Sequence, residues 1–153
     1  MRNSEVLRRK QRLDYVFAQT RNVSQDPEIL AHWARYLCIL VSGFLESSIR
    51  TLYGDYTRRA AAPNIVNFVE GELKFFQNAK MEKIIALAGS FSLAWAEELK
   101  GASEGAVKDA VDSIVANKNS IAHGESVGIT VARVQRYYER TLEVLETIET
   151  QCA

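Results

Sequence analysis

The sequence has few of the residues that cross-link a small fold or coat nucleic acid with charge. Only two cysteines, Cys38 and Cys152, occur in 153 residues, and neither belongs to a Cys-x-x-Cys pair or a His/Cys cluster. A structural zinc site is therefore not expected. We expect two buried or free thiols, with a Cys38–Cys152 disulfide as the alternative. The 19 basic and 19 acidic residues give zero net charge, which argues against binding of nucleic acid by bulk charge but not against a local basic site.

Long apolar runs are also absent. The longest, residues 36–45, is interrupted by Ser42 and Gly43 and is too short to span a bilayer. The first residues lack the apolar core of a signal peptide. We therefore expect a cytoplasmic protein with no membrane partner. The length suits a single domain over residues 1–153, and the 47% hydrophobic content is sufficient for a core without disulfides.

Helical spacing of apolar residues dominates the chain, and no stretch shows the strict alternation of a strand. Asp26-Pro27-Glu28 is a strong helix start, and Gly124 suits a left-handed helix end. Ser103 and Thr130 are expected to cap two further helices. The pattern predicts an all-α, up-and-down bundle of five or six helices. The expected segments are 3–21, 27–58, 64–77, 81–99 (with Gly89-Ser90 as a candidate division), 103–123 and 130–150.

Charge is unevenly distributed along this neutral chain. Residues 1–21 carry six basic and two acidic side chains, a net charge of +4, so the remainder sums to −4. A solvated helix face is the simpler interpretation of the basic segment. A basic arm close to a nucleic-acid site is the alternative.

Residues 117–125 are the strongest candidate for a functional site, because they place a cation, amides, a hydroxyl and an imidazole at one helix end. Asn119 and His123 are four residues apart and share a helix face. Lys118 is five residues before His123, about 140° around an ideal helix. A cation, an amide and an imidazole around one small volume suit a phosphodiester, since the cation offsets charge and the imidazole moves a proton. Taken alone, a histidine at a helix end is more often a cap or a surface residue.

The run Lys118-Asn119-Ser120-Ile121-Ala122-His123-Gly124 resembles the signature of HEPN domains, in which Arg precedes His by a few residues. It is particularly similar to the RiboL-PSP-type branch, and residues 42–50 resemble the central helix of that branch. The resemblance implies an all-α bundle that dimerises, with the two motifs facing each other. It also implies metal-independent endoribonuclease activity, without a cofactor, in toxin–antitoxin, phage-defence or RNA-processing systems.

The resemblance assigns acid/base catalysis to His123, the polar position to Asn119 and the Arg position to Lys118. Lysine there is a departure, because it is a point charge without the planar fork of arginine. Arg133 or Arg136 on the last helix, or an arginine of the N-terminal helix, could supply the missing guanidinium.

Three further residues are candidates for supporting the motif or binding RNA. Ser120 lies inside the motif. Glu46 and Arg50 are four residues apart on the central helix, either as an ordinary intrahelical pair or as a buried pair that orients the motif.

The leading hypothesis is therefore a homodimeric ribonuclease that acts on RNA. The second is a non-catalytic HEPN module that binds RNA, a nucleotide, or a partner such as a cognate antitoxin or another neighbouring-gene protein. The third is a purely structural helical interaction protein whose motif is an ordinary helix end.

Overall fold

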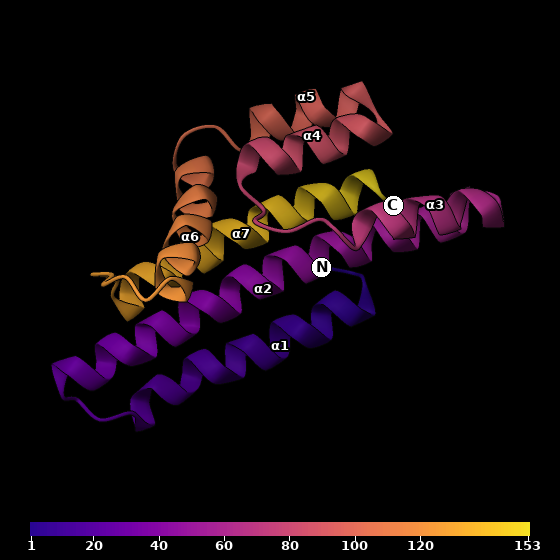
Figure 1. The fold of residues 1–153 in the computed structure, drawn as a ribbon. Coiled ribbons are helices and arrows are strands. Elements are labelled where there is room, and N and C mark those ends of the chain that lie inside the picture. The colour runs from indigo at the N-terminus through magenta and orange to yellow at the C-terminus, as the bar shows by residue number, and fades with distance from the viewer.

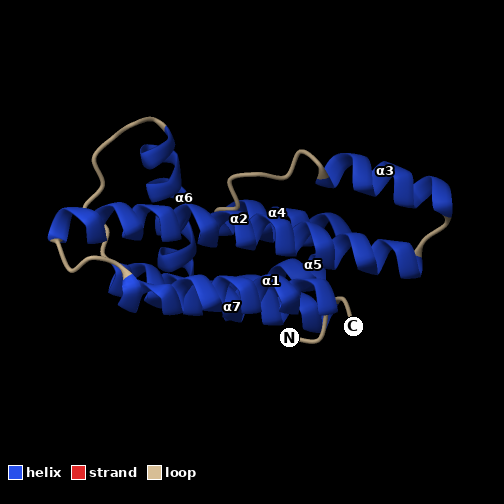
Figure 2. Ribbon diagram, turned by 90° about the horizontal axis from the view of Figure 1, so that it is seen from below, coloured by secondary structure: helices blue, strands red, loops and turns tan.

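A computed structural model describes residues 1–153, which form seven α-helices, one short 3-10 helix and no strand (Figures 1 and 2). The fold class is confirmed as all-α, but the helix count exceeds the predicted five or six. The helices are α1 (Ser4–Ala18), α2 (Pro27–Ala60), α3 (Pro63–Leu73), α4 (Met81–Phe91), α5 (Leu93–Ala102), α6 (Ala106–Ala122) and α7 (Val131–Gln151), and the 3-10 helix spans Gln19–Asn22.

The extra helix comes from a break at Ser92 rather than at Gly89-Ser90. Ser92 has an extended backbone, with φ −159° and ψ 128°, and separates α4 from α5. Gly89 and Ser90 both lie inside α4. The predicted position of the break was wrong because glycine and proline are the residues that mark helix breaks in a sequence, and this break occurs at a serine.

Side-chain caps mark the starts of α1, α2 and α7. The Asp26 side chain accepts hydrogen bonds from the backbone N–H groups of Glu28 and Ile29, with Pro27 in the first turn, as predicted. The Thr130 hydroxyl accepts from Arg133 N over 3.2 Å. Ser103 does not cap α6, whose N-cap is Gly105 with φ 71°. The predicted cap at Ser103 was therefore wrong.

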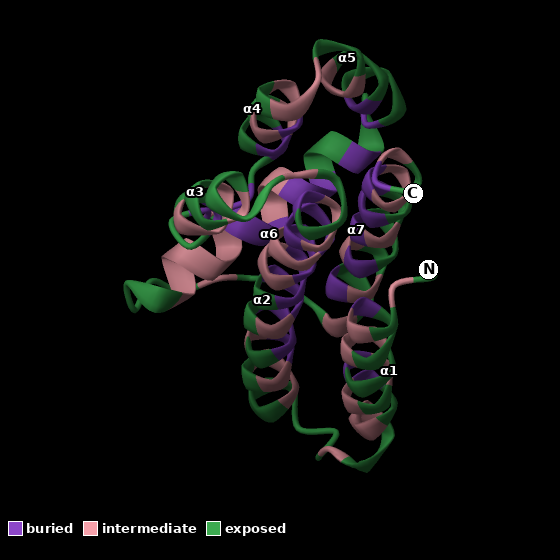
Figure 3. Ribbon diagram, turned by 90° about the vertical axis from the view of Figure 1, so that its right-hand side faces the viewer, coloured by how far each residue is buried: buried purple, intermediate pink, exposed green.

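The long helix α2 is the centre of the molecule and packs against α1, α3, α6 and α7 (Figure 1). Its buried residues join side chains of the other helices in one hydrophobic core, and Figure 3 shows the buried surfaces facing inward. α2 is long and apolar enough to cross a membrane, but the core helix of a soluble protein meets the same two criteria. Its contacts with four helices are those of a core helix. Cys38 and Cys152 are both buried free thiols.

Replacing Leu45 by Ala should destabilise the protein by about 2–5 kcal/mol, because Leu45 is fully buried on α2 and its loss leaves a cavity. The matched change Leu93→Ala, at a side chain that is 81% exposed, should alter stability by no more than about 0.5 kcal/mol. Urea unfolding of both variants measures the difference. Equal losses would contradict the assignment of α2 as the core helix.

Candidate functional site

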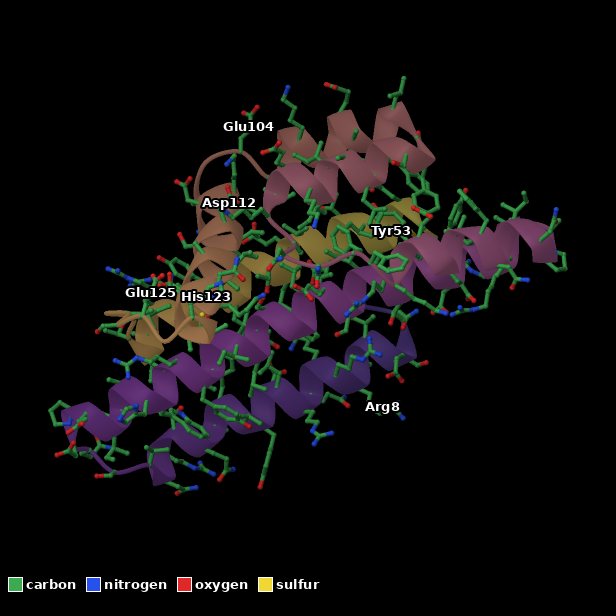
Figure 4. The ribbon with its side chains drawn as sticks, in the orientation of Figure 1. Arg8, Tyr53, Glu104, Asp112, His123 and Glu125 are labelled. Atoms are coloured by element: carbon green, nitrogen blue, oxygen red, sulfur yellow. The ribbon has the colours of Figure 1, made fainter.

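The end of α6 turns sharply and leaves its last side chains in solvent. The backbone N–H of Glu125 donates to Ser120 O over 2.9 Å, and that of Gly124 donates to Ile121 O over 3.0 Å. This pair of bonds is a Schellman motif, and Gly124 takes the required left-handed conformation at φ 74°. His123 is the residue just before this turn, and Figure 4 shows it at the end of α6 beside Glu125.

Lys118 is held in place from outside its own helix. Its Nζ donates to Oδ1 of Asn78 over 2.9 Å, and the backbone N–H of Asn78 donates to Oε1 of Glu46 over 2.7 Å. Asn78 has a φ of 54°, a left-handed conformation that asparagine tolerates better than most residues. The lysine on α6 is thus connected to α2 through one residue of the α3–α4 connection.

Additional contacts fix that connection, residues 74–80. Arg50 Nη1 donates to the carbonyl oxygen of Phe76 over 3.3 Å. The backbone N–H of Met81 donates to Oδ1 of Asp112 on α6 over 2.8 Å. Figure 1 shows the connection running back along α2 towards α6. The connection and the first residue of α4 are therefore bonded both to α2 and to α6, the helix that carries the motif.

Glu46 and Arg50 do not form the predicted intrahelical pair, because no ion pair joins them. Each instead bonds the α3–α4 connection, Glu46 at Asn78 and Arg50 at Phe76. The pairing predicted from their spacing was wrong, since both side chains find partners outside α2. Both side chains contact the segment that holds Lys118, and their role in supporting the motif stays a prediction.

The other side chains of the motif have free hydrogen-bonding groups. His123 is exposed, Asn119 and Ser120 are half-buried, and none of the three forms a side-chain hydrogen bond within the chain. An imidazole without an internal partner is open to contact by a bound ligand. The site therefore presents one oriented cation and one open imidazole on the same helix end.

Arg133 and Arg136 lie in the first two turns of α7, and both are exposed. Neither guanidinium has a hydrogen bond or an ion pair within the chain, so nothing connects them directly to the motif. Figure 1 places the start of α7 close to the end of α6.

The nearest thiol is not a chemical participant. Burial raises the pKa of the Cys38 thiol to about 11, although the charge of Lys118 lowers it. The thiol is therefore neutral at physiological pH and is not a nucleophile. No group of three or more His, Cys, Asp or Glu side chains that could hold a metal ion is present.

Sequence reasoning missed Asn78 and Asp112, and with them the α3–α4 connection. Asn78 is 40 residues from Lys118, and Asp112 is 31 residues from Met81. Neither contact could therefore be predicted from the spacing of neighbouring residues. A helix was predicted as far as residue 77, but α3 ends at Leu73. The Gln77-Asn78 pair before an apolar helix was the one available signal for a turn.

Replacing Asn78 should separate its backbone role from its side-chain role. Asn78→Ala should destabilise the protein by about 1 kcal/mol more than Asn78→Gly, because glycine adopts the left-handed conformation without steric cost. Both variants lose the hydrogen bond to Lys118, so the difference between their stabilities in thermal unfolding measures the cost of the left-handed backbone conformation alone. Equal stabilities would mean that the left-handed conformation is not retained in solution.

The comparisons with known proteins agree with this architecture. A family model described as RiboL-PSP-HEPN matches residues 4–153, and therefore covers nearly the entire chain, including the motif and the central helix. The comparisons with curated proteins and with solved structures gave no match. On the strength of the family match, the chain belongs to the RiboL-PSP-HEPN family.

Proposed function

We propose that the protein is a cytoplasmic, metal-independent endoribonuclease that acts as a homodimer, with a site built from His123, Lys118 and Asn119. The observation that carries the proposal is the presence, at the end of α6, of an open His123 imidazole and of a Lys118 ammonium group that Asn78 orients. The family suggests ribonuclease or nucleotide-binding function. A role as a toxin–antitoxin or phage-defence nuclease is part of the same proposal.

The proposed reaction is attack of the RNA 2′-OH on the adjacent phosphate. A His123 imidazole takes the 2′-OH proton while the new O–P bond forms. The bond to the 5′-oxygen breaks, and the leaving oxygen receives a proton from imidazolium. The products are a 2′,3′-cyclic phosphate and a 5′-OH end. Lys118 retains two N–H donors after its bond to Asn78, and these stabilise the charge that develops on the phosphate.

Dimerisation would bring a second imidazole and a second lysine to the same phosphate. The exposed face of α2 supports it: Tyr36 and Ile39 are exposed there, and a Cβ added to Gly43 would meet no atom within 4 Å. A glycine inside a helix costs about 0.5–1 kcal/mol relative to alanine. Nothing within the chain uses the space beside Gly43, whereas close approach of a second copy would.

A non-catalytic module that binds RNA, a nucleotide or a partner protein is the second candidate. The observation that favours it is the identity of residue 118. Lysine cannot bind phosphate through a planar fork, and one of its three donors is already used by Asn78. This candidate predicts binding of RNA without turnover at any pH.

His123→Ala should abolish cleavage of single-stranded RNA and leave the melting temperature nearly unchanged, because the side chain is exposed and makes no internal hydrogen bond. The matched control is His32→Ala, the other histidine, which is also exposed. Cleavage is measured by gel, and the products are tested for cyclic phosphate ends. Activity that survives in His123→Ala, or is lost equally in His32→Ala, argues against the assigned role.

Cleavage should persist in EDTA, since no step of the proposed reaction uses a metal ion. The parent protein is dialysed against the chelator and assayed on the same RNA. Loss of activity that magnesium restores would contradict the mechanism.

Lys118→Arg should keep or raise the cleavage rate, because arginine adds a planar pair of donors and can still donate to Asn78. Lys118→Met, which is similar in length and uncharged, should reduce kcat strongly. Single-turnover kinetics separates this effect from RNA binding. A lower rate in Lys118→Arg would mean that the motif has been misplaced on the chain.

Gly43→Leu should dissociate the proposed dimer without unfolding the chain, because the added side chain meets open space in the single copy. Light scattering gives the mass in solution, and circular dichroism checks helicity. Ala132→Leu, at an exposed position of α7, is the control. A dimer that tolerates Gly43→Leu does not use this face of α2.

A further inference from the structure

The α3–α4 connection presents two side chains that its structural role does not explain. Phe75 is 78% exposed, and Lys74 is exposed and has no hydrogen-bond or ion-pair partner. They precede Phe76 and Asn78 in the chain. Phe76 contacts Arg50, Asn78 contacts Glu46 and Lys118, and these contacts anchor the segment. An exposed aromatic ring and a free cation are thus held on a segment with little freedom to move.

Lys74 lies at the edge of a groove formed by α1, α2 and the end of α3. The groove has a volume of about 490 Å³ and one apolar lining residue, Leu73. Four cations and one carboxylate line it, together with hydroxyl groups: Arg9, Arg50, Arg58, Lys74, Glu70, Ser47 and Thr51. This cluster lies in a protein whose net charge is zero.

The cations of the groove differ in how far they are neutralised. Arg58 is paired with Asp55 and Glu70. Arg9 is shared between Glu5 and the polar atoms of Ser47 and Thr51. Arg50 and Lys74 have no carboxylate partner, so they are the groups available to an anionic ligand.

Arg50 connects this groove to the catalytic motif. It lies one helical turn from Glu46 on α2 and bonds the carbonyl oxygen of Phe76. Two residues later, Asn78 bonds both Glu46 and Lys118. The groove and the motif therefore lie at the two ends of one short anchored segment.

We propose that this groove is a docking subsite for single-stranded RNA, in which Arg50 and Lys74 contact backbone phosphates and Phe75 stacks on a base. Phe75 does not line the groove itself, but it directly follows the lining residue Lys74 in the chain. A positive groove and an exposed aromatic ring are the combination by which proteins bind single strands without reading their sequence. The subsite rests on the proposed ribonuclease function, for which it holds the strand that continues beyond the cleaved phosphate.

The charges of the groove favour RNA over a second copy of the chain. A two-fold interface places the same patch of each copy against the other, so a patch with four cations and one carboxylate would face a second patch with the same excess of positive charge. Neither exposed phenylalanine lines the groove, but Phe75 directly follows the lining residue Lys74, whereas Phe68 on α3, which is 68% exposed, is two residues from the nearest lining residue, Glu70. If the aromatic side chains served a protein interface instead, Phe68 and Phe75 would contribute equally.

The test measures RNA binding in a His123→Ala background, so that no strand is cleaved. A short fluorescein-labelled single-stranded RNA is titrated at several salt concentrations and followed by anisotropy. Phe75→Ala should weaken binding by about 5- to 150-fold without changing the salt dependence, and Phe75→Trp should restore affinity. Lys74→Ala should lower the slope of log affinity against log salt by about 0.7, because one phosphate contact is lost.

Phe68→Ala and Lys100→Ala are the matched controls, since both side chains are exposed and neither residue lines the groove or directly follows a residue that does. Both should bind RNA as tightly as the His123→Ala parent. The subsite is disproved if Phe75→Ala and Lys74→Ala bind normally, if Phe68→Ala loses as much affinity as Phe75→Ala, or if the parent binds no RNA.

The two proposals fail in different ways. If the chain with His123 intact never cleaves RNA while Phe75→Ala and Lys74→Ala still weaken binding, the nuclease function fails and the subsite stands. If cleavage depends on His123, but substitution of Lys74 and Phe75 changes neither the RNA affinity nor its salt dependence, the subsite fails and the nuclease function stands.

Discussion

The hydrogen bond between Lys118 and Asn78 is the contact on which the candidate site depends. A lysine side chain is long and flexible, and a free one would spread its charge over many positions. Here Asn78 accepts from Nζ, and Glu46 in turn accepts from the backbone of Asn78, so the ammonium group is oriented by α2 through a single intermediate residue. Arg50 and Asp112 secure the two ends of the same segment. In the proposed function, rigid support of this kind compensates in part for lysine in a position where the family pattern has arginine.

Zero net charge is compatible with RNA binding once the charges are placed in space. The excess positive charge of the first helix meets α2 at Arg9, which lines a groove with Arg50, Arg58 and Lys74. Carboxylates neutralise part of that groove through Glu5, Asp55 and Glu70. What remains is a small number of free cations close to the motif. In the proposed function, this surface binds and positions the RNA strand with modest, salt-sensitive affinity, and the motif carries out the reaction.

Features encoded by neighbouring residues could be predicted from the sequence. Asp26, Pro27 and Glu28 marked the start of α2, and Gly124 marked the end of α6, because capping depends on side chains within a few positions. The family resemblance followed from the Lys118–Gly124 run and was confirmed. The break at Ser92 and the partners of Glu46, Arg50 and Lys118 could not be predicted. Each depends on how distant segments pack, and an isolated spacing such as Glu46 to Arg50 indicated a pair that the fold does not form.

The proposed reaction requires a 2′-OH as the nucleophile, and one substrate isolates that requirement. The parent protein is incubated with an oligonucleotide that is deoxy throughout except for a single ribonucleotide, and the products are identified by mass spectrometry. We predict a cut only after the ribonucleotide, with a 2′,3′-cyclic phosphate on one fragment and a 5′-OH on the other. Cleavage at deoxy positions, or fragments that end in a 3′-OH and a 5′-phosphate, would show that water or another nucleophile attacks the phosphate, and would contradict the role assigned to His123.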